Sequence, residues 1–131
     1  MDATRASGRK RILLVEDEPG YQELMETILS AGPFEMTACA SFEEAASKME
    51  AESFDLIISD INLPGMTGMQ VLEKMKTLGR LEICPVVMCS SQFNSETKEM
   101  VLNMGAAGFI PKPYQSKVVL SLIKALLDVK S

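Results

Sequence analysis

Side chains that could do chemistry follow four short apolar runs of the chain. They are Glu16, Asp17 and Glu18 after residues 12–15, Ser59 and Asp60 after residues 56–58, Ser90 and Ser91 after residues 86–88, and Lys112 after residues 108–110. Taken singly, each has an ordinary structural explanation as a helix cap, a turn former or a solvated loop residue. If the four runs are parallel strands, however, these groups meet at one edge of a sheet.

Carboxylates that are crowded together repel one another, and this cost makes sense only if a cation joins them. The available ligands are carboxylate and carbonyl oxygens, because the chain contains no histidine. Hard oxygen ligands of this kind favour Mg²⁺, with Mn²⁺ as a second option. A metal, an ammonium and a hydroxyl around an anionic centre favour phosphoryl transfer, in which an Asp carboxylate can itself be the nucleophile.

Composition narrows the class of protein. The 131 residues, with 47 % apolar residues and a formal net charge of −5, indicate one folded domain. The absence of histidine excludes Ser-His-Asp and Cys-His nucleophiles and His-ligated zinc. The three cysteines are widely spaced and form no disulfide framework, which favours a cytoplasmic location. An acidic chain without tryptophan is not expected to bind nucleic acid, and no apolar run is long enough to cross a membrane.

Short apolar runs alternate with amphipathic stretches, which is typical of an α/β domain. Strands are expected at residues 12–15, 35–40, 56–58, 86–88 and 108–110. Helices are expected from Pro19 to near Gly32, after a Ser41 cap, over residues 70–78, from a Ser95 cap to near Met104, and over residues 116–129. We therefore predict a doubly wound, five-stranded parallel sheet with five helices on its two faces. Residues 1–10 are expected to be a flexible, basic lead-in and residues 11–130 the folded domain.

Four segments resemble the receiver domain of two-component response regulators, the chemotaxis-type family. They read ILLVEDEP at 12–19, LIISDINLPGMTG at 56–68, PVVMCSS at 85–91 and GFIPKPY at 108–114. Each segment alone is a weak indication, whereas all four in order, at the expected strand ends, are specific. The resemblance covers essentially the whole folded part and implies a flavodoxin-like fold with strand order 2-1-3-4-5.

Carried over residue by residue, the resemblance implies that Asp60 is the phosphoacceptor. Glu16 and Asp17 match the family's acidic pair, which binds Mg²⁺ directly or through water. The backbone carbonyl of Asn62 matches the third protein ligand of the metal. Glu16 stands where Asp is commoner, and its longer side chain can still reach the metal through a water molecule.

Three further residues match the family's phosphoryl clamp and its switch. Ser90 matches the hydroxyl residue that binds a phosphoryl oxygen, and Lys112 matches the lysine that pairs with the acceptor carboxylate and then with the phosphoryl group. Phe109 matches the aromatic switch position. Ser90 replaces the more frequent Thr, and Phe109 lacks a phenol oxygen, but neither departure removes a required group. Asn62 and Gln92 are expected either to tune the lifetime of the phosphorylated state or to be ordinary loop amides.

The function that the resemblance implies is a phosphoacceptor switch of a two-component system. A histidine kinase or a histidine phosphotransfer protein would supply the phosphoryl group, and the chain would perform only Mg²⁺-dependent self-phosphorylation and autodephosphorylation rather than act as an enzyme. Phosphorylation would shift the face formed by helix 95–104, strand 108–110 and helix 116–129. This shift would change the binding of a downstream protein by a cytoplasmic monomer or weak, phosphorylation-dependent dimer.

Two other functions stay open on the sequence alone. A receiver-like fold can serve as a binding or dimerisation module without phosphorylation, although such modules often lose one of the site residues that this chain retains. A phosphatase of the haloacid dehalogenase type needs an acid two residues after its nucleophile, where this chain has Asn62. The sequence names neither a kinase nor a downstream target, and it fits both a stand-alone regulator and a domain of a larger protein.

Overall fold

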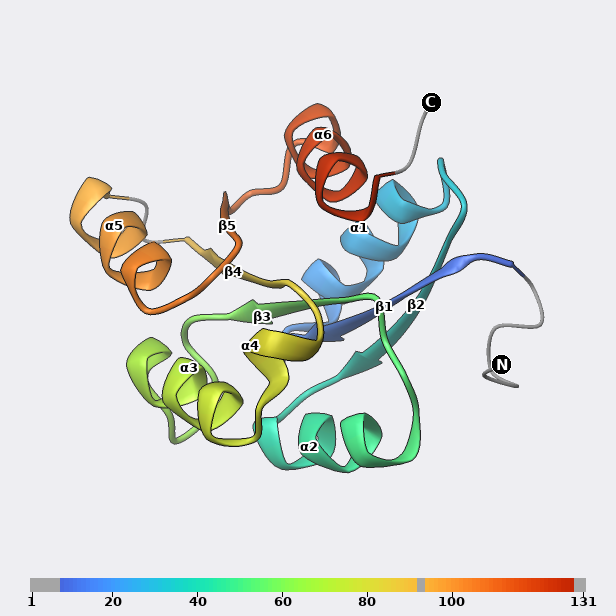
Figure 1. The fold of residues 1–131 in the computed structure, drawn as a ribbon. Coiled ribbons are helices and arrows are strands. Elements are labelled where there is room, and N and C mark those ends of the chain that lie inside the picture. The colour runs from blue at the N-terminus through green and yellow to red at the C-terminus, as the bar shows by residue number, and fades with distance from the viewer. Residues whose placement is uncertain (1–7, 92–93, 129–131) are drawn as a thin grey trace.

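A five-stranded parallel sheet forms the centre of the molecule in the computed structural model, which describes residues 8–91 and 94–128 (Figure 1). The strands are β1 (Lys10–Val15), β2 (Phe34–Cys39), β3 (Leu56–Asp60), β4 (Val86–Ser90) and β5 (Gly108–Pro111). Their order, β2-β1-β3-β4-β5, confirms the predicted doubly wound topology. The direction of winding reverses between β1 and β3, so the carboxyl ends of these two strands open into the crevice where such sheets bind ligands.

Six helices connect the strands in the described part of the chain. They are α1 (Pro19–Leu29), α2 (Phe42–Ala51), α3 (Gly68–Thr77), α4 (Arg80–Ile83), α5 (Ser95–Asn103) and α6 (Ser116–Leu127). The prediction of five helices is therefore wrong, because α4 was missed. This single turn begins after Gly79, whose φ of 73° lies in the left-handed region that glycine adopts readily. A segment of four residues is too short to show helical periodicity.

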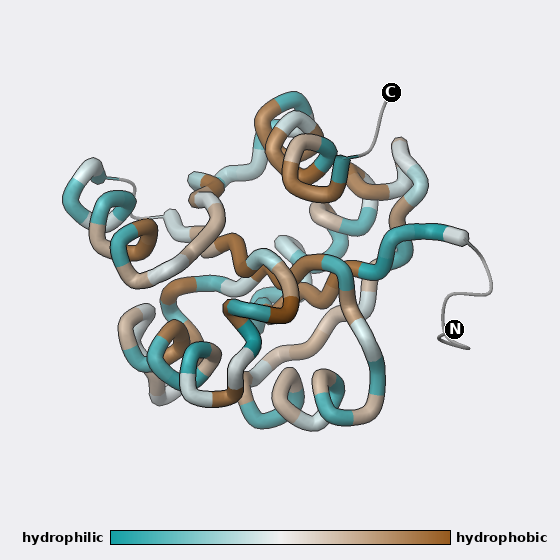
Figure 2. The backbone as a smooth tube through the Cα atoms, viewed as in Figure 1, coloured by the Kyte–Doolittle hydropathy of each residue, from teal (hydrophilic) through white to brown (hydrophobic). Residues whose placement is uncertain are grey.

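The helices cover both faces of the sheet, with α1 and α6 on one side and α2, α3 and α5 on the other (Figure 1). Because side chains alternate across a strand, β1 serves both layers. Ile12 and Leu14 pack in the apolar cluster beneath α1 and α6, whereas Leu13 and Val15 pack in the opposite cluster. The central strands are buried on both faces and are accordingly apolar along most of their length (Figure 2).

Side-chain caps fix where several helices begin. The Ser41 hydroxyl accepts a hydrogen bond from the Glu44 amide at 3.2 Å, as the predicted cap of α2 requires. Thr67 and Gln70 form a reciprocal capping box at α3. At α5 the predicted Ser95 cap is wrong by one residue, because Asn94 Oδ1 accepts from the amide of Thr97 at 2.7 Å. Two neighbouring residues can both cap a helix, and the sequence does not say which one does.

The first strand begins at Lys10, one residue before the expected start of the folded domain. Residues 1–7 of the expected lead-in lie outside the described residues. Arg11 is buried, donates from its guanidinium to the carbonyl of Ser53 at 2.9 Å and pairs with Glu52. Its guanidinium also lies 5.0 Å from the ring centre of Phe54. Arg11 thus ties β1 to the turn between α2 and β3.

Candidate functional site

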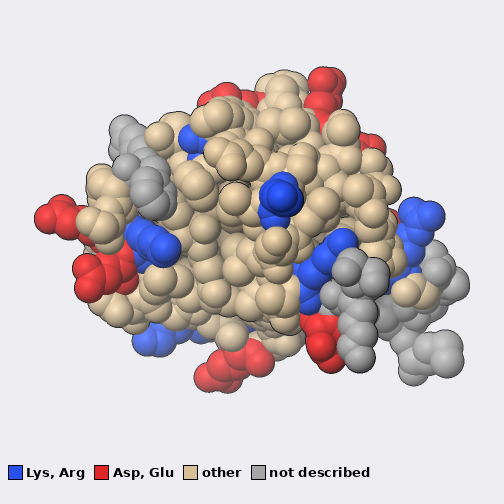
Figure 3. Space-filling model, turned by 90° about the horizontal axis from the view of Figure 1, so that it is seen from above, with Lys and Arg blue, Asp and Glu red and all other residues tan. Residues whose placement is uncertain are grey.

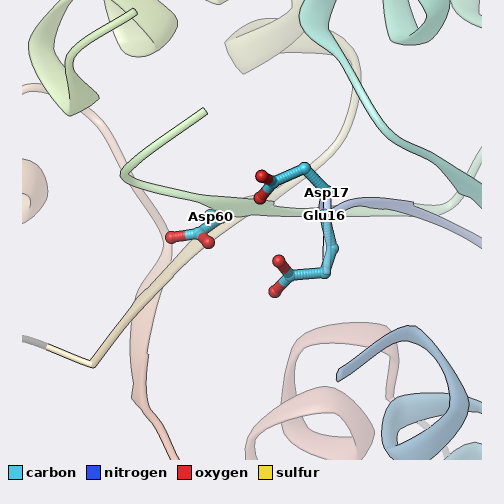
Figure 4. A group of neighbouring side chains, drawn as sticks. All are labelled: Glu16, Asp17 and Asp60. Carbon is cyan, nitrogen blue, oxygen red and sulfur yellow. The ribbon is translucent and has the colours of Figure 1, made fainter. Parts of the chain in front are cut away.

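Three carboxylates meet at the carboxyl ends of β1 and β3. Val15 of β1 pairs with Ser59 of β3. The residues that follow this pair, Glu16 and Asp60, therefore lie next to each other at the end of the two strands. Asp17 comes next in the chain, and one oxygen from each of Glu16, Asp17 and Asp60 lies within 4.8 Å of the other two. The side chains of Glu16 and Asp17 lean from the end of β1 toward Asp60 (Figure 4). The predicted acidic group is therefore assembled by the strand register.

The three carboxylates differ in their access to solvent. Glu16 is fully buried, Asp60 is 5 % exposed, and Asp17 is exposed. Burial raises the pKa of Glu16, while hydrogen bonds from Lys112 and from the backbone amide of Glu18 act in the opposite direction. The site is thus buried at Glu16 and Asp60 and exposed to solvent at Asp17. A small ion or a phosphoryl donor can approach from the side of Asp17.

Lys112 lies between the two buried carboxylates. Its Nζ is 2.5 Å from Oε1 of Glu16 and 2.8 Å from Oδ2 of Asp60. Burial acts to lower the pKa of Lys112, but the hydrogen bonds to Asp60 and Glu16 outweigh it, so the pKa is raised and the ammonium stays charged. The cation of the predicted clamp is consequently in place before any phosphoryl group arrives.

The charges and donor atoms of this group fit a divalent metal ion. One ammonium against three carboxylates leaves two negative charges unbalanced. The three residues offer only hard carboxylate oxygens, and Mg²⁺ prefers one or two carboxylates, retained waters and a phosphate oxygen. Glu16, Asp17 and Asp60 therefore suit Mg²⁺ in charge and in the type of donor atom.

The remaining predicted residues differ in their relation to Asp60. The backbone amide of Asn62 donates to Oδ1 of Asp60 at 3.1 Å, so the loop after β3 orients the acceptor carboxylate. Ser90 is buried at the end of β4, and its carbonyl accepts from the amide of Lys112 at 2.9 Å. Phe109 lies outside the charged group, because its side chain is buried in the apolar cluster on the α2, α3 and α5 side. Gln92 lies outside the described residues.

Two residues of α1 that the sequence analysis did not connect with the site also contact it. The side-chain amide of Gln22 donates to the carbonyl of Glu16 at 2.6 Å, and Lys112 Nζ lies 4.2 Å from the ring centre of Tyr21. Both follow the acidic residues within the first turn of α1. Their spacing from Glu16 was visible in the sequence, but the contact of Tyr21 with Lys112 joins residues that are far apart in the chain and depends on tertiary packing.

A hollow of the surface lies away from the carboxylates. A cavity of about 310 Å³ is lined by residues such as Leu29, Phe34 and Met36, at the end of α1 and along β2. Because the first residues of β2 are at the amino-terminal edge of the sheet, this cavity is separate from the carboxylates at the carboxyl edge.

Fold and site together define a flavodoxin-like, doubly wound domain with an acidic, lysine-bridged site at its switch point. The family model described as "Response regulator receiver domain" matches residues 12–124. The chain belongs to the family of response regulator receiver domains, the signalling modules of two-component systems. These domains are signalling proteins rather than classical enzymes, and in general they bind Mg²⁺ at an acidic pocket.

Curated relatives and solved structures agree with this assignment. The chain is 33 % identical over 113 residues to "Response regulator protein FleR" of Pseudomonas aeruginosa, covering 86 % of this chain and 24 % of that protein. It is 30 % identical over 118 residues to "Phosphate regulon transcriptional regulatory protein PhoB" of Escherichia coli, covering 90 % and 52 %. A CheY-like receiver domain protein from Methanospirillum hungatei is 33 % identical with a TM-score of 0.80, over 92 % of this chain and 94 % of that one.

A chemotaxis response regulator of Vibrio cholerae is 26 % identical, with a TM-score of 0.81 over 91 % of this chain and 99 % of that one. The chain thus spans nearly the whole of these solved receiver structures, but about half or less of the curated relatives named above. In the part of the chain that the structure describes, the helices are all too short or too polar to cross a membrane.

Proposed function

We propose that this receiver domain is a phosphoacceptor switch in which Asp60 is phosphorylated. The observation that carries the proposal is the position of Asp60, whose two carboxylate oxygens are held by different partners. Oδ1 accepts from the amide of Asn62 at 3.1 Å, and Oδ2 contacts Lys112 Nζ at 2.8 Å. A carboxylate that is fixed in this way, beside two further carboxylates and an ammonium, is suited to in-line attack on an anionic phosphoryl group.

The proposed phosphodonor is a phosphohistidine on a histidine kinase or a histidine phosphotransfer protein, because the chain itself has no histidine. A carboxylate oxygen of Asp60 forms the new O–P bond while the N–P bond of the donor breaks, and the leaving imidazole takes up a proton. Mg²⁺ would be held by Glu16, Asp17, Asp60 and the carbonyl of Asn62. It would supply positive charge that neutralises charge on the transferring phosphoryl group. Mn²⁺ offers the same chemistry.

Lys112 and Ser90 form the proposed clamp on the phosphoryl oxygens. The backbone hydrogen bond from Lys112 to the Ser90 carbonyl joins the ends of β4 and β5, so a displacement of one residue is transmitted to the other. Phe109 is the proposed switch residue and is 8 % exposed here. Its burial in the apolar cluster supports the proposal that the ring can take the inward orientation without a phosphoryl group. The proposed switch is therefore a change in the populations of two packings rather than the creation of a new one.

The face formed by α5, β5 and α6 is the proposed output surface. α5 buries only Val101 among its nine residues, so little packing holds it in place. Viewed from above, where α6 lies in Figure 1, most of the surface is uncharged, with separate basic side chains on it and acidic side chains mostly at its edges (Figure 3). Val118 of α6 is 44 % exposed. We propose that a downstream protein binds this face, and that the working domain comprises residues 11–130 and acts in the cytoplasm.

Phosphorylation is tested by incubating the protein with acetyl phosphate and Mg²⁺ and measuring its intact mass. The expected result is one added phosphoryl group in the wild type and none in Asp60→Asn. Asp128→Asn is the matched control, because Asp128 is exposed and its φ of 53° suits Asn equally well. Unmodified wild-type protein, or equal modification of Asp60→Asn, would refute the proposal. A wild type that stays unmodified but binds its partner normally would favour the phosphorylation-independent module instead.

A further inference from the structure

The ammonium of Lys112 has an aromatic neighbour in addition to its two carboxylate partners. Lys112 Nζ lies 4.2 Å from the ring centre of Tyr21, well within the about 6 Å over which a cation is attracted to an aromatic face. The carboxylates of Glu16 and Asp60 contact the same nitrogen at 2.5 Å and 2.8 Å. Lys112 is therefore held by three groups from three different elements: the end of β1, the end of β3, and α1.

The position of Tyr21 is set by the same loop that positions the acidic pair. Pro19 is the first residue of α1, and the amide of Tyr21 donates to the carbonyl of Glu18 at 3.1 Å. Gln22 reaches back to the carbonyl of Glu16 at 2.6 Å. These bonds join the first turn of α1 to the carboxylate loop, so the ring and Glu16 share one rigid backbone segment.

A second tyrosine packs against the ring of Tyr21. Tyr114 meets Tyr21 edge to face, with ring centres 5.3 Å apart and an interplanar angle of 68°. The Tyr114 hydroxyl lies 3.3 Å from Sγ of Cys89, the residue before Ser90 in β4. Tyr114 is buried, whereas Tyr21 is half-buried at the margin of the apolar cluster. Core packing alone does not require a ring over an ammonium, since Met25 and Ile28 already bury the inner face of α1.

From this arrangement we infer that Tyr21 is a positioning residue of the phosphoacceptor site, whose ring holds the Lys112 ammonium against Asp60. The inference rests on the proposed function, because it assigns Tyr21 a role in placing the clamp. When Glu16 engages another partner, Lys112 loses one of its two ion pairs, and the ring then still retains the ammonium beside the acceptor. Without the ring, the ammonium loses its aromatic contact from α1 and keeps only its carboxylate partners.

The test compares Tyr21→Leu, which removes the ring, with Tyr21→Phe, which keeps the ring and loses the hydroxyl. Leu24→Ala is the control, because Leu24 is one turn further along α1 and 37 % exposed. The first measurement is NMR of the full chain without divalent ions. The ε-methylene protons of Lys112, assigned by their loss in Lys112→Met, are shifted upfield by the ring current in wild type, Tyr21→Phe and Leu24→Ala. In Tyr21→Leu this shift disappears.

The second measurement is the rate of phosphorylation by acetyl phosphate with Mg²⁺. A loss of cation–π attraction predicts a rate lower by about two- to thirtyfold in Tyr21→Leu, with Tyr21→Phe restored to the wild-type value. A Lys112 resonance without an upfield shift in wild type, or equal rates in Tyr21→Leu and wild type, would overturn the assignment. If no variant is phosphorylated, the proposed function fails, while the NMR comparison still decides whether Tyr21 positions Lys112.

Discussion

Lys112 is buried between Glu16 and Asp60. Its removal should lower the free energy of unfolding and should strengthen the binding of Mg²⁺. In Lys112→Met, two buried carboxylates lose the cation that lies 2.5 Å and 2.8 Å from them. Breaking a buried ion pair by removing one partner costs about 3–5 kcal/mol. A small domain has about 5–15 kcal/mol of stability in total. The variant should therefore fold, but with a clearly lower free energy of unfolding in the absence of divalent ions.

The same change should strengthen the binding of Mg²⁺. Removal of the ammonium leaves three carboxylates without a neutralising charge. Even with the full screening of bulk water, a unit charge acting on a divalent ion at about 5 Å contributes about 1.5 kcal/mol, so affinity should rise by about tenfold or more. Saturating Mg²⁺ should then return much of the stability lost by Lys112→Met, because a ligand that binds only the folded state stabilises it by mass action.

Urea unfolding followed by circular dichroism, in EDTA and in excess Mg²⁺, measures the first effect, and calorimetric titration with Mg²⁺ measures the second. Lys117→Met is the matched control, because it removes an exposed lysine from the first turn of α6 with the same change in net charge. Wild-type stability of Lys112→Met in EDTA would refute the reasoning. So would weaker Mg²⁺ binding by that variant than by the control.

Three further outcomes are expected. Asp17→Asn removes one carboxylate charge from the group and should weaken Mg²⁺ binding about tenfold or more, which calorimetric titration measures. Because Asp17 is exposed, the stability in EDTA should change little. Burial raises the pKa of Cys39 to about 12, so its contribution to stability is complete below pH ~8.5 and is lost as the pH rises toward 12. Between pH 8 and pH 10 urea unfolding should show a loss of about 2 kcal/mol from this thiol, which Cys39→Ala should not show. Arg11→Met should lower the free energy of unfolding by about 2 kcal/mol without changing Mg²⁺ affinity, because its contacts with Ser53 and Glu52 lie at the opposite edge of the sheet.

The sequence predicted the strands well because their signal is local and repeated, whereas their order was implied by the resemblance to receiver domains. Each buried strand appears as a short apolar run, and the alternation with amphipathic segments determines a parallel sheet. The carboxyl ends of parallel strands meet at one edge, so the proximity of Glu16, Asp17, Asp60 and Lys112 followed from topology without any side-chain detail. Helix α4 was missed because one turn, Arg80–Ile83, shows no periodicity.

Contacts between distant residues of ordinary type could not be predicted. Tyr21 and Tyr114 are far apart in the sequence, and nothing in either segment alone indicates that their rings meet beside Lys112. Arg11 stands next to the apolar run 12–15, and nothing in the sequence indicates that the fold buries its side chain against the turn at Ser53. A charged residue next to an apolar run has the same appearance whether it is solvated or buried with a partner, and tertiary packing decides between the two.

The shortest strand of the sheet has a consequence for how copies of the chain can meet. β5 is an edge strand of four residues, and its last residue, Pro111, has no amide hydrogen to donate. A second molecule that tried to extend the sheet at this border would find few backbone groups to pair with, and Pro113 follows two residues later. Self-association at this border is therefore expected to use the neighbouring helices, and a β-sheet continuous across two molecules is not expected there.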